Sequence, residues 1–207
     1  MYNTPVQTVA RIGAMGQREH LLEGARTCLV ERGFAHTTAR DIVAATSGAA
    51  NLASIGYHFG SKDALMNAAV IQLIEDWGDR IAEATDSAGT GRPAERLERF
   101  LQSVLSADPE QRRVIGASVQ AYAQAEFSVE VREQFRSTYD RARVDLAAFV
   151  LGIDRDDVTP SQAATIGSLS LALLNGAALQ WFVDPTAAQG FAELSTTLAA
   201  LGADPAD

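Results

Sequence analysis

The side chains best suited to chemistry are concentrated in residues 37–65, with the sequence TTARDIVAATSGAANLASIGYHFGSKDAL. Hydroxyl side chains recur there together with one amide, one phenol and one imidazole, and only two carboxylates interrupt them. Such side chains hydrogen-bond to phosphate oxygens and base edges, and they enter a groove of DNA without acidic repulsion. The residues that we expect to point outward for this purpose are Asn51, Ala53, Ser54, Tyr57 and His58.

The same stretch predicts the elements that would present these side chains. Thr38 offers an N-cap for a helix over 39–46, and Ser47 with Gly48 predicts a turn. A short helix over about 50–57 follows, and it is too small to bury a core of its own, so a recognition helix is expected there. Its inward-facing residues would be Leu52, Ile55 and Phe59.

The rest of the chain predicts helices almost throughout, because apolar residues recur at three- and four-residue spacing without a strand pattern. We expect an all-α fold of about nine helices, the others over 17–32, 62–84, 93–107, 109–125, 128–151, 160–183 and 186–201. These elements predict a flexible N-terminal arm over 1–16, a three-helix helix-turn-helix domain over 17–61 and a helical C-terminal domain over 62–207.

Charge is unevenly distributed along the chain. Residues 1–62 carry six basic and four acidic side chains, a net charge of +2. The remainder carries a net charge of −11, which gives the total of −9. A phosphate backbone repels acidic surface. Only the N-terminal third is therefore expected to face nucleic acid.

The composition also bears on the cellular compartment. Cys28 is the only cysteine, so no intrachain disulfide can form, and its apolar neighbours predict a small core residue. No signal peptide begins the chain, and polar residues interrupt its most apolar stretch, 163–183. We expect a cytoplasmic protein without a membrane partner.

The distribution of histidines argues against catalysis. His20, His36 and His58 all lie in the N-terminal third, so the large C-terminal domain holds neither histidine nor cysteine. A Ser-His-Asp or Cys-His site there is excluded, and so is most zinc chemistry. We predict a protein that is not an enzyme, with no metal site and no cofactor.

Three motifs resemble the tetracycline-repressor (TetR) family of regulators: TTARDI, NLASI and YHFGSKDAL, within about Gln17–Val70. The resemblance implies a double-stranded DNA operator as partner. It places Thr38 and Arg40 near the DNA backbone. Base edges in the major groove would be contacted by Asn51, Ala53 and Ser54, and phosphates would lie near Tyr57, His58 and Lys62. Lys62 begins a helix, and an ammonium at a helix N-terminus is a good anion site.

The helix over 160–183 is apolar nearly all round and therefore needs cover on both sides. A second subunit is the expected cover, in a four-helix interface with the last helix; burial within one chain is the alternative. A homodimer would hold two recognition helices about 34–36 Å apart, the spacing of a palindrome. The expected interface residues are Ile166, Leu169, Leu173, Ala177, Trp181, Phe191, Leu194 and Leu198.

A small-molecule effector would bind among the helices of the C-terminal domain. Candidates combine bulk with polar groups, although an ordinary core role is the alternative for each: Trp77, Phe100, Gln120, Tyr122, Tyr139 and Asn175. The few charges in the apolar stripes predict an apolar or amphipathic ligand. Its binding would select a domain rotation in which the recognition helices no longer match the operator.

The function expected on these grounds is a ligand-responsive repressor that releases its operator on binding the effector. The alternative is a helical small-molecule-binding protein that has lost operator binding. Two departures from the family pattern support that alternative. The turn TSGAAN is about two residues longer than in the family, and Gly56 weakens the short helix by roughly 1 kcal/mol relative to alanine.

Overall fold

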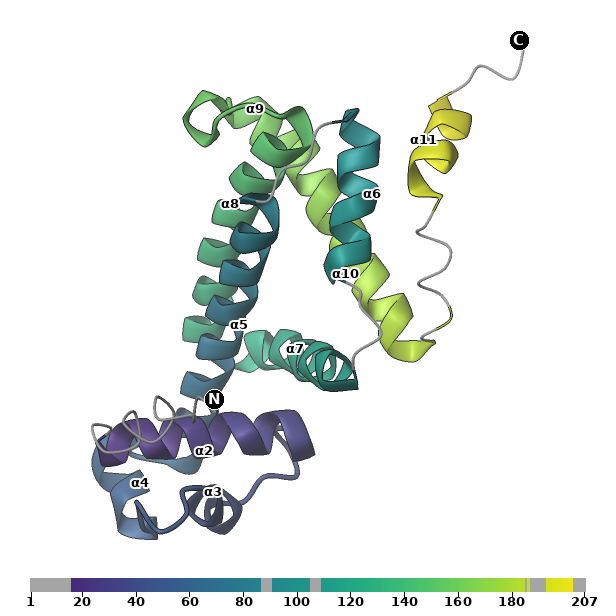
Figure 1. Ribbon diagram of the computed structural model, residues 1–207. Helices are drawn as coiled ribbons and strands as arrows, with labels where there is room; N and C mark the ends of the chain where they lie inside the picture. Colours follow the sequence, from purple (N-terminus) through teal and green to yellow (C-terminus); the bar gives the residue numbers. More distant parts are fainter. Residues whose placement is uncertain (1–15, 87–90, 105–108, 185, 187–192, 203–207) are drawn as a thin grey trace, which may run out of the picture. The chain divides into compact units, whose positions relative to one another are not determined.

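The computed structural model describes residues 16–86, 91–104, 109–184, 186 and 193–202. Counting the continuous segment Pro160–Val183 once, these residues form nine helices longer than one turn and no strand (Figure 1). The all-α prediction is confirmed. The expected arm lies outside the described residues except for Gly16.

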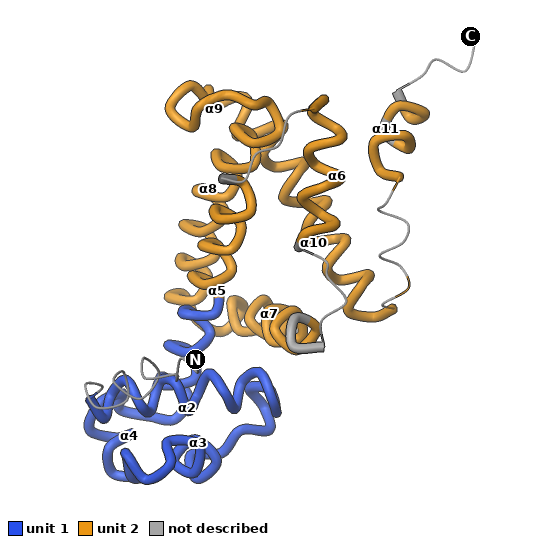
Figure 2. Tube along the Cα trace, in the orientation of Figure 1, with its two compact units in different colours: residues 1–73 blue, residues 74–207 orange. Residues whose placement is uncertain are grey.

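The chain divides into two compact units, residues 1–73 and 74–207 (Figure 2). The division falls inside α5 (Lys62–Asp86), whereas the expected domain boundary lay at the start of that helix. The first turns of α5 belong to the N-terminal unit because Leu65, Met66 and Ala69 are fully buried there.

The N-terminal unit contains α2 (Gln17–Arg32), α3 (Ala39–Ala45), α4 (Leu52–Phe59) and the start of α5. Local sequence explains where the helices begin, because Thr38 caps α3 with a reciprocal hydrogen bond to Asp41. The apolar core that joins the helices consists of Leu21, Leu22, Ala25, Cys28, Leu29, Ile42, Ile55, Leu65, Met66, Ala69 and Val70.

Helix α4 begins two residues later than the expected 50–57. Asn51 does not belong to the helix but caps it, because its side-chain oxygen accepts a hydrogen bond from the backbone N–H of Ser54 at 3.1 Å. Gly60 ends α4 with a φ of 80°, a backbone conformation that favours glycine. The expected inward position of Leu52 is also wrong, since this first helical residue is 50% exposed.

The C-terminal unit contains the remainder of α5, α6 (Pro93–Val104), α7 (Pro109–Phe127) and α8 (Val129–Leu151). The segment Pro160–Val183 follows as α9 (Pro160–Gln162), a π-helical turn (Ala163–Gly167) and α10 (Ser168–Val183). Only glycine fits at position 167, because a Cβ there would overlap the backbone of Arg143 on α8. The hydrophobic core of the C-terminal unit includes Ile81, Phe100, Leu101, Leu146, Phe149, Leu171, Leu174 and Trp181.

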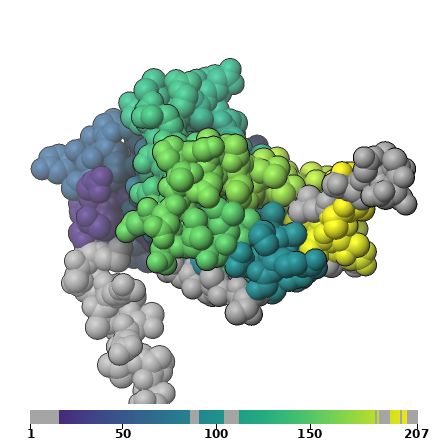
Figure 3. All heavy atoms as spheres, turned by 90° about the horizontal axis from the view of Figure 1, so that it is seen from above, coloured from purple at the N-terminus to yellow at the C-terminus, as the bar shows by residue number. Residues whose placement is uncertain are grey.

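The last described helix, α11 (Leu194–Gly202), packs against α6. The backbone N–H of Ser195 donates to Glu98 of α6 at 2.9 Å, and Leu194 is buried in the core cluster. Figure 3 shows α6, in dark teal, beside both the green segment Pro160–Val183 and the yellow α11. Of the expected helix over 186–201, residues 187–192 lie outside the described ones.

The segment Pro160–Val183 has the length and mean hydropathy, 1.4, of a membrane span, and 33% of its most apolar window is buried in the structure. A core or interface helix of a globular protein has the same composition. The exposed apolar part of this helix is therefore a surface that some other molecule is expected to cover.

Candidate nucleic-acid interface and effector pocket

Helix α4 has one buried and one open face. Ser54 and Ile55 are buried, whereas Leu52, Ala53, Gly56 and Tyr57 share the open face at helical spacing. Tyr57 is 85% exposed and packs edge-on against His58, with 4.9 Å between the ring centroids. No residue of α4 carries a carboxylate, so this face can approach a polyanion.

Ser54 does not point outward as expected. Its side chain is buried, and its hydroxyl donates to Gln17 Oε1 of α2 at 3.2 Å. A buried hydroxyl needs such a partner. The Ser54 hydroxyl, which was expected to contact bases, is therefore part of the contact between α2 and α4. Asn51 is exposed but is occupied as the N-cap, whereas Ala53 keeps its expected outward position.

The start of α3 places Thr38 and Arg40 on the surface. The hydroxyl of Thr38 donates to Asp41 at 2.6 Å, and Arg32 pairs with the same carboxylate at 2.6 Å. Hydrogen bonds from the Thr38 side chain and backbone lower the pKa of Asp41, and Arg32 adds to the effect. Arg40 has no hydrogen bond or ion pair within the described part of the chain, so its guanidinium is available to a phosphate.

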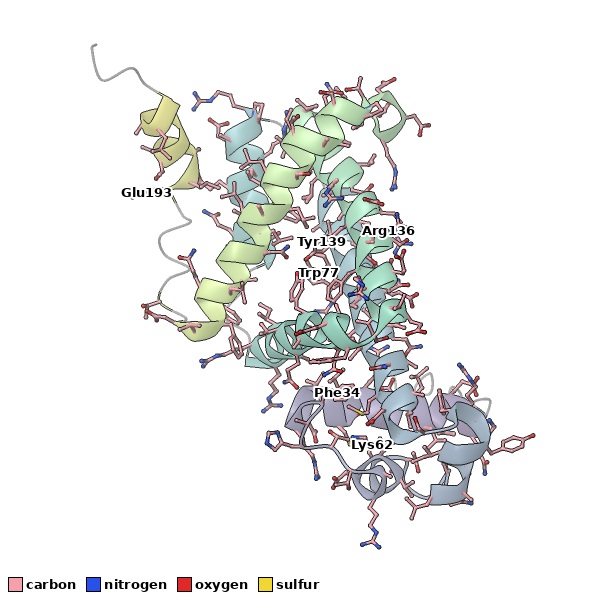
Figure 4. The ribbon with its side chains drawn as sticks, turned by 180° about the vertical axis from the view of Figure 1, so that it is seen from behind. Phe34, Lys62, Trp77, Arg136, Tyr139 and Glu193 are labelled. Carbon is pink, nitrogen blue, oxygen red and sulfur yellow. The ribbon has the colours of Figure 1, made fainter. Side chains whose placement is uncertain are left out.

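Lys62 is held against its own unit. Its ammonium donates to the carbonyl of Thr37 at 3.3 Å, lies 5.5 Å from the ring centroid of Phe34 and pairs with Asp63 at 3.0 Å (Figure 4). These contacts join the start of α5 to the loop between α2 and α3. The side chain as a whole remains 31% exposed.

The C-terminal unit contains a narrow pocket, about 40 Å³ in volume, between α5, α7, α8 and α10. Its lining is apolar and aromatic with a few neutral polar groups: Ile74, Trp77, Ile115, Ser118, Val119, Tyr122, Phe135, Asn175, Ala178 and Leu179. Apolar walls with a small number of polar groups are typical of small-molecule sites.

Three predicted pocket residues, Trp77, Tyr122 and Asn175, are among the lining residues. Tyr139 lies next to them, with its ring centroid 6.0 Å from that of Trp77 (Figure 4). Phe100, by contrast, is 2% exposed and packs on Phe149 in the core. Gln120 is half-buried and is not part of the lining.

Phe135 also lines the pocket, although it was not among the predicted pocket residues. Its ring stacks on Tyr122 with 4.6 Å between centroids, and it lies one helical turn before Tyr139 on α8. The four-residue spacing of Phe135 and Tyr139 could have predicted it, because side chains at this spacing lie on the same face of a helix.

A chain of hydrogen bonds joins three helices at the pocket. Asn175 of α10 donates its amide N–H to the Tyr139 hydroxyl of α8 at 3.0 Å, and that hydroxyl is hydrogen-bonded to Tyr122 of α7. Burial raises the pKa of both tyrosines above the ordinary value. The phenols are therefore neutral at physiological pH and present no formal charge to the pocket.

The residues of the expected dimer interface divide between the surface and the core. Leu169 is 60% exposed, whereas Ile166 and Leu173 are half-buried. Ala177, Trp181 and Leu194 are buried within their own chain. Phe191 lies outside the described residues, and the side chain of Leu198 is not described.

A capped helix-turn-helix unit followed by a helical unit with an apolar pocket defines a transcriptional regulator. Residues 21–69 match the family model of the bacterial regulatory proteins of the tetR family. Residues 93–203 match the family model of the BetI-type transcriptional repressor, C-terminal region. The chain belongs to the tetR family, with a C-terminal half of the BetI type.

Solved structures share the fold. A transcriptional regulator from Rhodococcus sp. Rha1 is 21% identical, with a TM-score of 0.67 over 90% of this chain and 97% of that chain. A TetR regulator from Haloarcula marismortui is 24% identical, with a TM-score of 0.62 over 87% and 97%. A Saccharomonospora viridis protein in complex with choline is 20% identical, with a TM-score of 0.63 over 84% and 92%. A comparison with curated proteins finds no match.

Proposed function

We propose that this chain is a cytoplasmic, dimeric transcriptional repressor that binds a palindromic operator and releases it on binding a small effector. The observation that carries the proposal is the open face of α4, which has no carboxylate and belongs to a helix-turn-helix unit of a regulator family. In this proposal the protein acts by binding and not by catalysis.

The proposed DNA contacts keep most of the expected residues. Arg40 and Lys62 supply positive charge for phosphates, and Tyr57 and His58 lie at the end of α4. Asn51, Ala53 and Thr38 lie at the exposed starts of α4 and α3. Ser54 is left out because its hydroxyl is buried and bonded to Gln17.

The effector is proposed to bind in the pocket between Trp77, Tyr122 and Asn175. The uncharged aromatic lining favours an apolar or amphipathic molecule. The Saccharomonospora viridis protein holds choline, a quaternary ammonium ion, and aromatic faces of the kind that line this pocket also bind such cations. Ligand pockets usually measure about 300–1,000 Å³. Since the volume of this pocket is far smaller, binding is expected to displace Tyr122, which is partly exposed.

The dimer is proposed to form through the open face of α10. Leu169, Leu179 and Val183 are 60%, 45% and 78% exposed, and Ala172 and Gly176 lie between them at alternating three- and four-residue spacing. A narrow apolar stripe of this period is what a facing helix covers, and the small residues allow close approach.

The test of the repressor is binding to DNA from around its own coding region at two salt concentrations. A footprint on a palindrome that weakens as salt rises is expected. Arg40→Ala should make the salt dependence shallower by about one unit of slope per lost phosphate contact. Arg132→Ala, which removes the same charge from an exposed position on α8, is the matched control.

If the protein binds a small molecule but leaves no footprint on DNA, the alternative of a small-molecule-binding protein is favoured. A titration with choline and with its uncharged isostere 3,3-dimethylbutan-1-ol, followed by the fluorescence of Trp77, tests the pocket directly. Trp77→Phe controls for the signal of the buried Trp181. A ligand that changes the fluorescence but does not release bound DNA would contradict the effector role.

A further inference from the structure

The open face of α4 has a composition that its fold does not require. Leu52 is 50% exposed at the first turn, one helical turn before Gly56. A Cβ built on Gly56 would meet no atom within 4 Å, so no packing constraint excludes a side chain at this position. Glycine is nevertheless a poor residue for the interior of an eight-residue helix.

Both features are explained if a surface approaches this face closely from outside. Exposed leucine offers an apolar contact, and the missing side chain of Gly56 leaves the helix backbone open to approach. In the major groove the only apolar group on a base edge is the 5-methyl group of thymine. Two of the polar side chains expected at the bases have partners in their own unit, since Ser54 is buried and the side-chain oxygen of Asn51 caps the helix, so Tyr57 supplies the polar group of this face.

We infer that α4 recognises thymine in each half-site through Leu52, which contacts the 5-methyl group, and that Gly56 allows the helix to approach the bases closely enough for this contact. This inference rests on the proposed operator binding and names the base that the operator presents. Leu52 and Gly56 are thus residues that determine specificity, whereas Arg40 and Lys62 supply sequence-independent attraction.

The first experiment removes single methyl groups from the DNA. An operator duplex is selected from random sequence with the full-length protein, and each symmetric pair of thymines is replaced by uracil, which lacks only the methyl group. We expect one pair at which affinity falls about fourfold per half-site, as for burial of one methylene-sized group. With Leu52→Ala that pair should no longer respond, whereas Leu201→Ala, at a leucine 79% exposed on α11, should leave the response intact.

The second experiment separates close approach from folding. Gly56→Ala is expected to raise the melting temperature by about 2–4 °C, because alanine favours the helix. It should weaken operator binding by about tenfold, comparable to a mismatched base pair. A more stable protein that binds less tightly cannot be explained by misfolding.

The possible outcomes distinguish a failure of thymine recognition from a failure of operator binding. If no sequence is selected from the random pool, operator binding itself is wrong. If an operator is selected but uracil substitution has no effect at any position, thymine recognition by Leu52 is overturned while operator binding stands. Unchanged or tighter binding by the stabilised Gly56→Ala protein would overturn the close approach.

Discussion

Residues with similar side-chain chemistry have different roles in the N-terminal unit. Asn51 and Ser54 both carry groups suited to a base edge, yet one caps α4 and the other bonds to Gln17. Leu52, which was expected inside, lies on the open face. The difference arises because Asn51 stays outside the helix as its N-cap, and because the packing of α4 against α2 and α3 decides which of its side chains are buried.

Lys62 combines two roles that a substitution can separate. Lys62→Met keeps an unbranched apolar side chain but removes the ammonium group that lies over the ring of Phe34. If the ammonium also meets a phosphate, the slope of log affinity against log salt should become shallower by about one. Binding measured at four salt concentrations checks this, and an unchanged slope with a lower melting temperature would restrict Lys62 to holding the α2–α3 loop.

The paired tyrosines predict a sensitivity to alkaline pH. Burial raises the pKa of Tyr122 and Tyr139 above the ordinary value of 10.0, so the folded state opposes their ionisation. The stability that this provides is complete below about pH 10 and is lost as the pH rises above it. Urea unfolding at pH 8 and pH 11 measures the free energy of unfolding at each pH. Its loss between the two should be smaller for the double variant Tyr122→Phe, Tyr139→Phe than for the unchanged protein. Tyr57→Phe, at an 85% exposed ring, should behave as the unchanged protein.

At the scale of elements, caps decide where the long helices begin. Ser128 is 5% exposed and accepts a hydrogen bond from the backbone N–H of Val131 at 3.2 Å, which starts α8. Ser128→Ala should lower the free energy of unfolding by about 1 kcal/mol. Denaturant unfolding measures the effect, with Ser137→Ala on the exposed side of α8 as control. Equal stability of the two variants would mean that the cap contributes little.

Helix α11 shows what an isolated pattern leaves open. Its apolar residues were expected to complete a dimer interface beside the helix over 160–183, yet Leu194 is buried against the chain's own core and Ser195 bonds to Glu98 of α6. Hydrogen bonds from Ser195 lower the pKa of Glu98. The periodicity of a helix identifies which face is apolar, but not which neighbour covers it.

At the scale of the whole molecule, the open stripe of α10 predicts a homodimer. Leu169→Glu places a charge on that stripe and should convert the protein to a monomer, since a buried unpaired charge is costly. Sedimentation velocity measures the change, and affinity for a palindromic operator should fall with it. Phe127→Glu, at a 79% exposed residue of α7, is the control. A Leu169→Glu protein that remains dimeric would place the interface elsewhere.

Local patterns were enough to predict the helical class and most helix boundaries, because caps, helix-ending residues and apolar spacing act over a few residues. The family followed from three short motifs in residues 37–65. Of the six side chains predicted for an effector site on bulk and polarity, Trp77, Tyr122 and Asn175 line the pocket. The same patterns could not predict that the Ser54 hydroxyl donates to Gln17, that Phe100 belongs to the core or that Leu52 is exposed, because these follow from how the helices pack. Each of these depends on a partner distant in sequence, and burial follows from which helices meet and not from the residue type alone.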